Sequence, residues 1–254
     1  MNTLISVIIV THNRERLLTG AIDSVLRQKF SDFELVIIDD ASTDNTGEVV
    51  KKYLVDKRVK YKKVAKCHSI AQVRNSAWPY VSGKYIAILD SDDIWCDDSK
   101  LNKQFEFLEN NINVVLVGGG AIMINEQGEE INRVFEPVSD NDIKKDFFIK
   151  NPFFHSSVMY RLDTVKQLGG YDEKVNYGED FDLWLRMGKI GQLHNIPDIF
   201  IKYRVHKDNE PNKHFFQAII DTLKVIKRNR KDYGLSLSIY FKKIYRKFFE
   251  YFYK

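Results

Sequence analysis

The first 110 residues alternate short apolar runs with longer segments in which apolar residues recur at helical spacing. The short runs are rich in valine and isoleucine and indicate strands, whereas the longer segments indicate helices. We expect strands at residues 4–10, 34–38, 59–64 and 85–89, and helices at 14–28, 45–54, 70–81 and 98–110. Regular alternation of strand and helix predicts an α/β fold with a mostly parallel sheet flanked by helices.

Polar residues follow three of the predicted strands at their carboxyl ends. Parallel strands end at one edge of the sheet, and ligands bind beyond that edge in open α/β folds. We therefore expect one site that includes Thr11, His12, Asn13 and Arg14, then Asp39 and Asp40, then Asp90, Asp92 and Asp93.

The three acids at residues 90–93 come directly after an apolar strand. Carboxylates this close repel one another and raise one another's pKa unless a cation lies among them. Oxygen-rich clusters suit Mg²⁺ or Mn²⁺, and such an ion can hold a diphosphate. We interpret the cluster as a metal-dependent site for a nucleotide-linked substrate. The alternative is an acidic turn that caps the next helix.

The second half of the chain has a different pattern. We expect a hairpin of residues 121–124 and 130–134, helices at 140–149 and 181–187, and strands at 156–161 and 199–205. Gly118–Gly120 indicates close packing or a bend. No glycine-rich nucleotide loop follows a strand, which disfavours dinucleotide redox chemistry and P-loop phosphoryl transfer.

Composition is that of an ordinary globular protein, with 254 residues, 44% hydrophobic and 29% charged. The two cysteines have no metal-type spacing, which suits a reducing compartment. The first residues do not resemble a signal peptide, and no apolar run reaches 18 residues. We expect a cytoplasmic protein.

Five motifs, in this order, carry a family resemblance: SVIIVTHNR (6–14), ELVIIDDASTD (34–44), RN (74–75), GKYIAILDSDD (83–93) and GEDFDLWLR (178–186). Together they resemble the inverting family 2 glycosyltransferases, which have the GT-A fold. The resemblance implies a GT-A domain over residues 1–210. Its nucleotide-sugar-binding half would cover about residues 1–115 and its acceptor-binding half about 116–210, followed by a helical tail at 211–254.

The resemblance also implies roles in donor binding. Asp40 would accept a hydrogen bond from the base, often uracil, because a carboxylate suits an imide N–H. Thr11, Asn13 and Arg14 would contact the nucleotide, and Arg74 would reach the base or the diphosphate. The residues before Arg74 depart from the family pattern, since 66–69 read Lys-Cys-His-Ser where relatives are glycine-rich.

For the metal, the resemblance implies Asp93 as a direct ligand, Asp92 on the ribose or the metal, and Asp90 in support on the nucleotide side. His206 would bind the metal or a phosphate, or be structural, and His155 and His12 are weaker candidates for the same role. The ion, Mn²⁺ or Mg²⁺, would offset charge on the leaving nucleoside diphosphate.

Glu179 and Asp180 form the acidic pair that is catalytic in similar enzymes. Asp180 would act as the base that takes a proton from the acceptor hydroxyl. The alternative is a pair of acids favoured by the dipole at a helix N-terminus.

The C-terminal region is strongly basic. Ten Lys or Arg and two acids lie between Lys224 and Lys254, a net charge of +8 that leaves −4 for the rest. Residues 235–254 interleave aromatic, aliphatic and cationic side chains, which predicts a helix on an anionic membrane surface, the inner face of the cell membrane. The alternative is a helix packed on its own domain or on a second subunit of a homo-oligomer. We expect no nucleic acid partner.

Three functions compete at this point. The first is transfer of a sugar from a nucleotide-sugar, a UDP-sugar, to a hydroxyl of a cell-surface glycan or lipid-linked saccharide. The second is a sugar nucleotidyltransferase, whose usual glycine-rich opening is absent. The third is an inactive nucleotide-sugar-binding scaffold subunit, which would have no need for Asp180.

Overall fold

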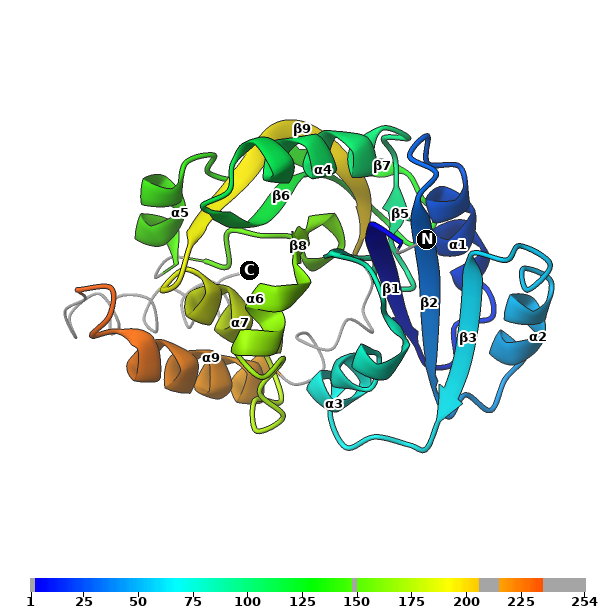
Figure 1. The fold of residues 1–254 in the computed structure, drawn as a ribbon. Coiled ribbons are helices and arrows are strands. Elements are labelled where there is room, and N and C mark those ends of the chain that lie inside the picture. Colours follow the sequence, from blue (N-terminus) through cyan, green and yellow to red (C-terminus); the bar gives the residue numbers. More distant parts are fainter. Residues whose placement is uncertain (1–2, 148–149, 206–214, 235–254) are drawn as a thin grey trace.

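The computed structural model describes residues 3–147, 150–205 and 215–234. In this part of the chain the strands form one nine-stranded mixed sheet (Figure 1). The strand order is β3-β2-β1-β4-β8-β6-β9-β5, and β7 pairs with β6. This arrangement confirms the predicted α/β class and the sheet flanked by helices.

The N-terminal half supplies four parallel neighbours at one side of the sheet. These are β1 (Ile5–Thr11), β2 (Phe33–Asp40), β3 (Val59–Val64) and β4 (Tyr85–Ile88). Every residue of β1 and β2 is buried, because helices cover both faces of the sheet. The carboxyl ends of β1, β2 and β4 therefore lie at one edge, as the polar strand ends predicted.

The C-terminal half completes the sheet through β8, which runs antiparallel to both β4 and β6. β9 lies parallel to β6 and antiparallel to the short β5, and β6 and β7 form the predicted hairpin. The strands are β5 (Ile94–Trp95), β6 (Val114–Ile124), β7 (Glu130–Val134), β8 (Met159–Arg161) and β9 (Gln192–Arg204).

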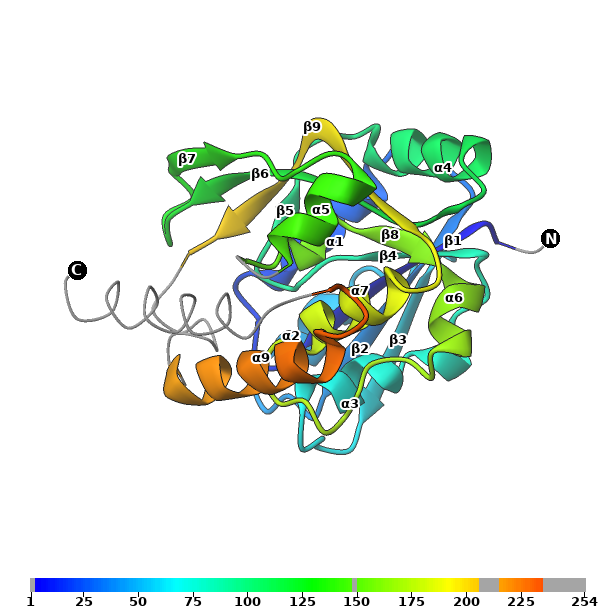
Figure 2. The same ribbon diagram turned by 90° about the vertical axis from the view of Figure 1, so that its left-hand side faces the viewer.

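Helices cover the two faces unequally. One face packs against α1 (Leu18–Leu26), α2 (Thr46–Lys51) and α4 (Lys100–Asn110). The other face packs against α3 (Ile70–Asn75), α5 (Asp140–Asp146), α6 (Leu162–Gln167), α7 (Glu179–Met187) and α9 (Phe215–Asn229). Figure 2 shows α7 and α9 side by side on this second face.

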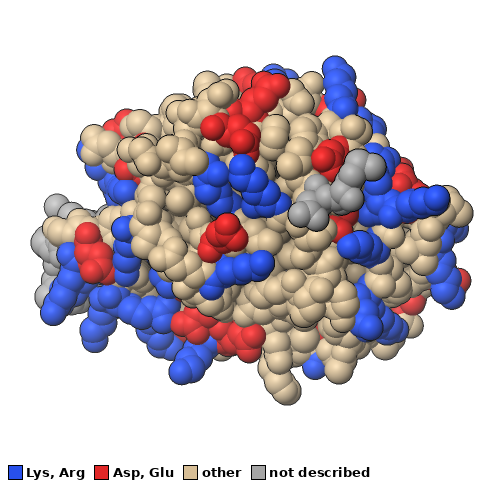
Figure 3. Space-filling model, viewed as in Figure 1, with Lys and Arg blue, Asp and Glu red and all other residues tan. Residues whose placement is uncertain are grey.

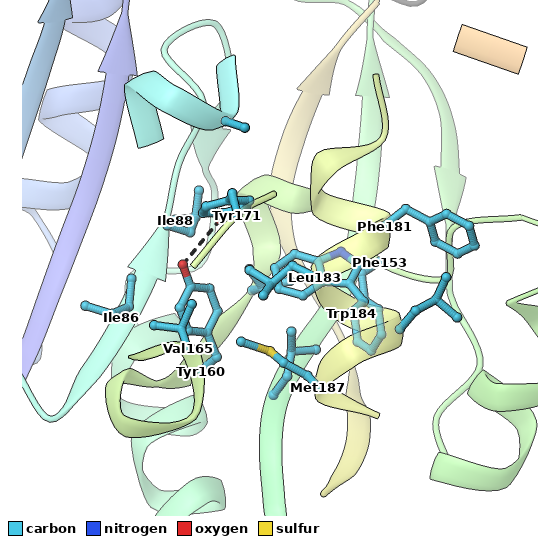
Figure 4. Packing of buried hydrophobic residues seen from close by; sticks show 14 of the residues in the cluster. Ile86, Ile88, Phe153, Tyr160, Val165, Tyr171, Phe181, Leu183, Trp184 and Met187 are labelled. Carbon is cyan, nitrogen blue, oxygen red and sulfur yellow. Dashed lines mark hydrogen bonds between the residues drawn. The ribbon is translucent and has the colours of Figure 1, made fainter. Parts of the chain in front are cut away.

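The hydrophobic core on this second face, called the second core below, is built around aromatic residues of α7. Phe181 and Trp184 pack among Phe153 and Tyr160, and the Tyr160 hydroxyl is 3.3 Å from that of Tyr171 (Figure 4). Burying large aromatic side chains of this kind stabilises a fold by several kcal/mol for each, on the order of 3–5 kcal/mol by truncation. The same packing fixes the start of α7, where Glu179 and Asp180 lie.

Several predicted boundaries are wrong for identifiable reasons. α1 begins at Leu18 instead of residue 14, because residues 15–17 form a turn whose start is held by the hydrogen bond from the Arg14 N–H to the Thr46 hydroxyl at the start of α2. The predicted helix at 70–81 ends at Asn75, and a separate 3₁₀ turn that contains Pro79 spans 78–80. The prediction for residues 121–124 found only the end of β6, which runs through all three glycines.

Gly118–Gly120 lie inside β6 because side chains from other elements pack directly on the strand. A Cβ at Gly119 would lie 2.4 Å from the Phe200 ring, and one at Gly118 would lie 2.4 Å from Asn195. Close packing is therefore the correct interpretation. The pairing of β6 with β9 also shifts register around Gly119 and Gly120.

The start of the predicted tail is packed on the domain. Val225 and Ile226 of α9 are buried in the second core, and the Tyr233 hydroxyl donates to the Leu185 carbonyl at 2.6 Å. Residues 235–254, expected on a membrane, lie outside the described residues. Among the helices that the structure describes, none is long and apolar enough to cross a membrane.

Candidate active site

Hydrogen bonds of Asn13 link the loop after β1 to the loop after β2. This residue has φ 51°, a left-handed conformation that Asn tolerates better than most residues. Its backbone N–H donates to the Ser42 hydroxyl at 2.9 Å, and its side-chain oxygen accepts the Thr43 N–H at 2.8 Å. Asn13 was expected on the nucleotide; in the structure its amide oxygen holds the second loop.

The two acids at the end of β2 have different surroundings. Asp39 is fully buried and accepts hydrogen bonds from the Ser42 N–H at 2.8 Å and from the Tyr61 hydroxyl at 2.5 Å. Asp40 accepts the Cys67 N–H at 2.7 Å and the Lys66 ammonium at 2.5 Å. The Lys66 side chain is 57% exposed, so the carboxylate of Asp40 lies under a cation that can move away.

Two of the three acids after β4 retain solvent exposure. The side chains of Asp90 and Asp92 are 27% and 21% exposed. An Arg14 guanidinium nitrogen lies 3.6 Å from the Asp92 carboxylate, which brings the loop after β1 against the acid cluster. The polar residues after β1 and those after β4 therefore lie together, as expected from the pattern of the strands.

Asp93 points into the protein. Only 2% of the residue is exposed, and its carboxylate accepts the Ser156 hydroxyl at 2.5 Å and the Arg204 N–H at 2.8 Å. Burial, with the nearby charges of Asp92 and Asp90, raises the pKa of Asp93 well above its usual range. Through its two carboxylate oxygens, Asp93 thus links the acid cluster to β9 and to the segment before β8.

Arg74 connects the acid cluster to the start of α7. Its guanidinium pairs with Glu179 and, at 3.2 Å, with Asp90, and it lies 5.5 Å from the centre of the Tyr171 ring. The side chain is only 9% exposed. Burial lowers its pKa, but the carboxylates of Glu179 and Asp90 outweigh burial and the net pKa is raised. Arg74 therefore holds both acids as a permanent cation.

His155 completes the polar network under the cluster. One ring nitrogen lies 3.2 Å from the Asp90 carboxylate and the other 3.0 Å from the Tyr171 hydroxyl. Burial acts to raise the pKa of Asp90, but the charges of His155 and Arg74 hold it well below its usual range. Asp90 is therefore ionised, whereas burial raises the pKa of Glu179 against the effect of Arg74.

Asp180 is the second residue of α7, which begins after Gly178 in a left-handed conformation with φ 81°. The Asp180 carboxylate accepts the Phe181 N–H at 2.7 Å on one oxygen and the Asn151 side-chain amide at 2.8 Å on the other.

Tyr203 of β9 is affected by acids that come from both halves of the chain. Its pKa is raised first by burial and then by four carboxylates, those of Asp93, Asp90, Asp92 and Asp180. The ion pairs of Arg74 with Asp90 after β4 and with Glu179, the neighbour of Asp180 in α7, join the same two segments. The end of β4 and the start of α7 therefore face a common region.

The donor set of this region is suited to a hard divalent cation. Asp90 and Asp92 offer partly exposed carboxylate oxygens, which Mg²⁺ and Mn²⁺ prefer. Among the described residues no group of three or more His, Cys, Asp or Glu is arranged to hold a metal by itself. His206, the other expected ligand, lies outside the described residues.

The sequence prediction omitted three residues that shape the site, Ser156, Asn151 and Tyr203, and it gave His155 only as a weaker candidate. His155 and Ser156 belong to a buried polar run, His155-Ser156-Ser157, directly before an apolar strand. This polar run directly before an apolar strand was the signal in the sequence that could have indicated His155 and Ser156 as site residues. No comparable local pattern marks Asn151, whose contact with Asp180 depends on the tertiary fold.

Comparison with known proteins identifies the family of the chain. The sequence profile of glycosyl transferase family 2 matches residues 6–167. An uncharacterised glycosyltransferase of Methanocaldococcus jannaschii is 33% identical over 251 residues, which cover 95% of this chain and 85% of that protein. The O-antigen biosynthesis glycosyltransferase WbnJ of Escherichia coli is 33% identical over 210 residues, 80% of each chain.

Solved structures share the fold at low identity. TarS 1–349 of S. aureus, in complex with UDP-GlcNAc, superposes with a TM-score of 0.69 at 18% identity and covers 97% of this chain and 73% of that one. The mannosyltransferase PcManGT of Pyrobaculum calidifontis, in complex with GDP-Man and Mn²⁺, has a TM-score of 0.67 at 15% identity, with coverages of 96% and 69%. On the profile match and the sequence relatives, the chain belongs to glycosyl transferase family 2.

Proposed function

We propose that the protein is a metal-dependent, inverting glycosyltransferase that moves a sugar from a UDP-sugar to an acceptor hydroxyl. The observation that supports this most directly is the pairing of Arg74 with both Asp90 after β4 and Glu179, the neighbour of Asp180 at the start of α7. Transfer from a donor to an acceptor needs carboxylates that hold the metal ion at the leaving diphosphate and another carboxylate that acts as the base. The segment after β4 supplies the first, and the start of α7 supplies the second.

The nucleotide would lie across the ends of β1 and β2. Asp40 is nearly buried and has an acceptor oxygen at the rim, where a base N–H could replace the Lys66 ammonium. The Thr11 hydroxyl at the end of β1 is buried and has no hydrogen-bond partner among the described residues. Arg14 follows β1 and lies 3.6 Å from the Asp92 carboxylate, and its guanidinium is suited to the diphosphate.

A divalent ion would be held by Asp92 with support from Asp90, and when bound it would stabilise negative charge on the leaving diphosphate. The sequence prediction placed Asp93 first among the ligands. Hydrogen bonds from Ser156 and Arg204 on its two oxygens favour Asp92 in that role instead. Asp93 would then fix the backbone that presents Asp92.

Asp180 would take the proton from the acceptor hydroxyl as that oxygen attacks the anomeric carbon. A base across the site from the diphosphate gives attack from the opposite face, and the anomeric configuration is inverted. Glu179 cannot take this role in the same way, because its carboxylate pairs with the buried guanidinium of Arg74. It would support the site through that ion pair.

The decisive variant is Asp180→Asn, with Asp163→Asn on the exposed surface of α6 as the matched control. We expect kcat to fall about 1000-fold or more, toward the upper range of a general base, while donor affinity stays within about twofold. Donor affinity is measured by calorimetry and the product anomer by NMR. Near-full turnover of Asp180→Asn, or a product with retained configuration, would contradict the proposal.

We also propose a polysaccharide or lipid-linked saccharide as the acceptor and an anionic membrane as the surface that residues 235–254 contact. Relatives of this chain are named for O-antigen and amylovoran biosynthesis, which supports a glycan acceptor. The membrane contact is supported by the sequence of the tail, which interleaves aromatic and basic residues.

A further inference from the structure

Asn151 lies on the loop between α5 and β8 and reaches across to the first turn of α7. Its side-chain nitrogen donates to the Asp180 Oδ2 at 2.8 Å. Its side-chain oxygen accepts the Phe153 N–H at 3.2 Å. Because the oxygen has its own backbone donor, the amide can present only its nitrogen to Asp180.

The loop that carries Asn151 is anchored directly after this residue. The carbonyl of the next residue, Pro152, accepts the buried Asn195 amide at 3.1 Å, and Phe153 packs against Trp184 of α7 with ring centroids 6.1 Å apart. Asn195 itself is 1% exposed. A side chain on so well-fixed a loop can hold a partner in one orientation.

We propose that Asn151 is a positioning residue that fixes the orientation of the Asp180 carboxylate toward the acceptor hydroxyl. The inference rests on the proposed function, in which Asp180 is the base. With the Phe181 N–H on Oδ1, the Asn151 amide on Oδ2 fixes rotation of the carboxylate, and each oxygen retains a lone pair for a proton.

The chemistry of the donor suits this role. A neutral amide orients a carboxylate without a full positive charge, whereas a Lys or Arg at the same place would hold the carboxylate ionised and make it a weaker base. The buried cation Arg74 is already paired with Glu179 and Asp90. Among the described residues, Glu179 of the same helix, Arg74 of α3 and Tyr203 of β9 interact electrostatically with Asp180.

The test compares the variants Asn151→Ala and Asn151→Asp with the unsubstituted protein. For Asn151→Ala we expect kcat to fall about 10- to 100-fold, with donor affinity within about twofold, because the base remains but its orientation is lost. For Asn151→Asp we expect the acidic limb of the kcat profile to move about one pH unit upward or more, because a second carboxylate beside Asp180 disfavours its ionisation. Asn111→Asp, on the exposed end of α4, is the matched control.

A purely structural role would lower the amount of folded protein without moving the pH profile. Circular dichroism and donor calorimetry therefore accompany each variant, and Asn151→Ser serves where Asn151→Asp does not fold. Unchanged kcat and an unchanged acidic limb in folded variants would overturn the inference. Failure of the proposed function is recognised separately, since Asp180→Asn would then turn over normally whatever Asn151 does.

Discussion

At the residue scale, the three acids after β4 show how one motif divides between function and support. Asp92 keeps a fifth of its side chain exposed and faces Arg14, whereas Asp93 is buried with both oxygens engaged. Spacing alone cannot distinguish the two, because the turn after the strand decides which carboxylate points outward. The alternative of a simple helix cap does not fit, since α4 begins only at Lys100.

This division predicts different losses for the two acids. Asp92→Asn is expected to lower kcat/KM about 100-fold, which corresponds to about 2.7 kcal/mol, because a ligand to the diphosphate-bound cation is lost. Its unfolding free energy should be unchanged within about 0.5 kcal/mol. Asp93→Ala should instead lose about 1–3 kcal/mol of unfolding free energy, because the Ser156 hydroxyl and the Arg204 N–H lose their acceptor. Denaturant titrations and steady-state kinetics in Mn²⁺ measure both effects.

The opposite result would reassign the motif. If Asp93→Ala folded with normal stability and lost all response to Mn²⁺, Asp93 would be the principal ligand, as the family resemblance implied.

Residues such as Asp40 and Asp180 could be selected from sequence because they follow a strand or open a helix in recognisable motifs. Asn151 and Tyr203 could not, since only the packed fold brings their loop and strand to the acids.

At the element scale, Glu34 fastens the amino ends of three strands, at the edge of the sheet opposite the site. Its carboxylate accepts the Ser6 hydroxyl of β1 at 2.6 Å and the Ser82 N–H before β4 at 2.7 Å, and it pairs with Lys60 of β3. Burial acts to raise the pKa of Glu34, but Lys60, Ser6 and Ser82 together lower it. An acid with a lowered pKa stabilises the fold when ionised.

Glu34→Gln is therefore expected to lose about 2 kcal/mol of unfolding free energy at pH 7. The stability that ionised Glu34 adds is present above its unfolded pKa, and it is lost as pH falls through the lower folded pKa. The difference between variant and wild type should consequently shrink below the ordinary value of 4.5. Thermal unfolding at several pH values measures this, with the exposed Glu48→Gln as control, expected to change stability by under about 0.5 kcal/mol. A difference that does not depend on pH would show that the charge of Glu34 is irrelevant.

Elements with a strong local pattern were predicted well and the others were not. The strand at 59–64 and the one at 130–134 were predicted with their observed bounds, because each has turn residues on both sides. β5 is two residues long and exists only because it pairs with β9. The length of β6 was missed because glycine disfavours strands, while packing of Phe200 and Asn195 requires glycine there.

At the scale of the whole molecule, Arg74 and α9 connect parts far apart in sequence. Arg74 joins α3 to the end of β4 and to α7, and Arg228 of α9 pairs with Asp172 and with the buried Asp182. The outer side of α9 carries exposed Lys224 and Lys227, and Figure 3 shows basic side chains gathered over this part of the molecule. The basic character predicted for the C-terminal region thus begins on a helix that packs on the domain.

The proposed membrane contact predicts that the full-length protein binds vesicles that contain anionic lipid and binds neutral vesicles weakly. Each cation near an anionic surface contributes about 1 kcal/mol, so reversing four of them should weaken binding about 1000-fold or more. The test variant changes these four residues of the tail to Glu: Lys242, Lys243, Arg246 and Lys247. A matched variant reverses four exposed cations near α2 and β3: Lys51, Lys52, Lys57 and Lys62.

Vesicle co-sedimentation at low and high salt distinguishes a membrane contact from the alternatives. Binding through the tail should disappear in the tail variant, persist in the matched variant, and weaken in high salt, because salt screens exposed charges. Transfer to a small soluble acceptor should remain normal in both variants, since the proposed site is formed by other residues. Equal binding by both charge variants would indicate that total charge attracts the protein to the membrane, and a change of oligomeric state in the tail variant alone would assign residues 235–254 to a contact between subunits.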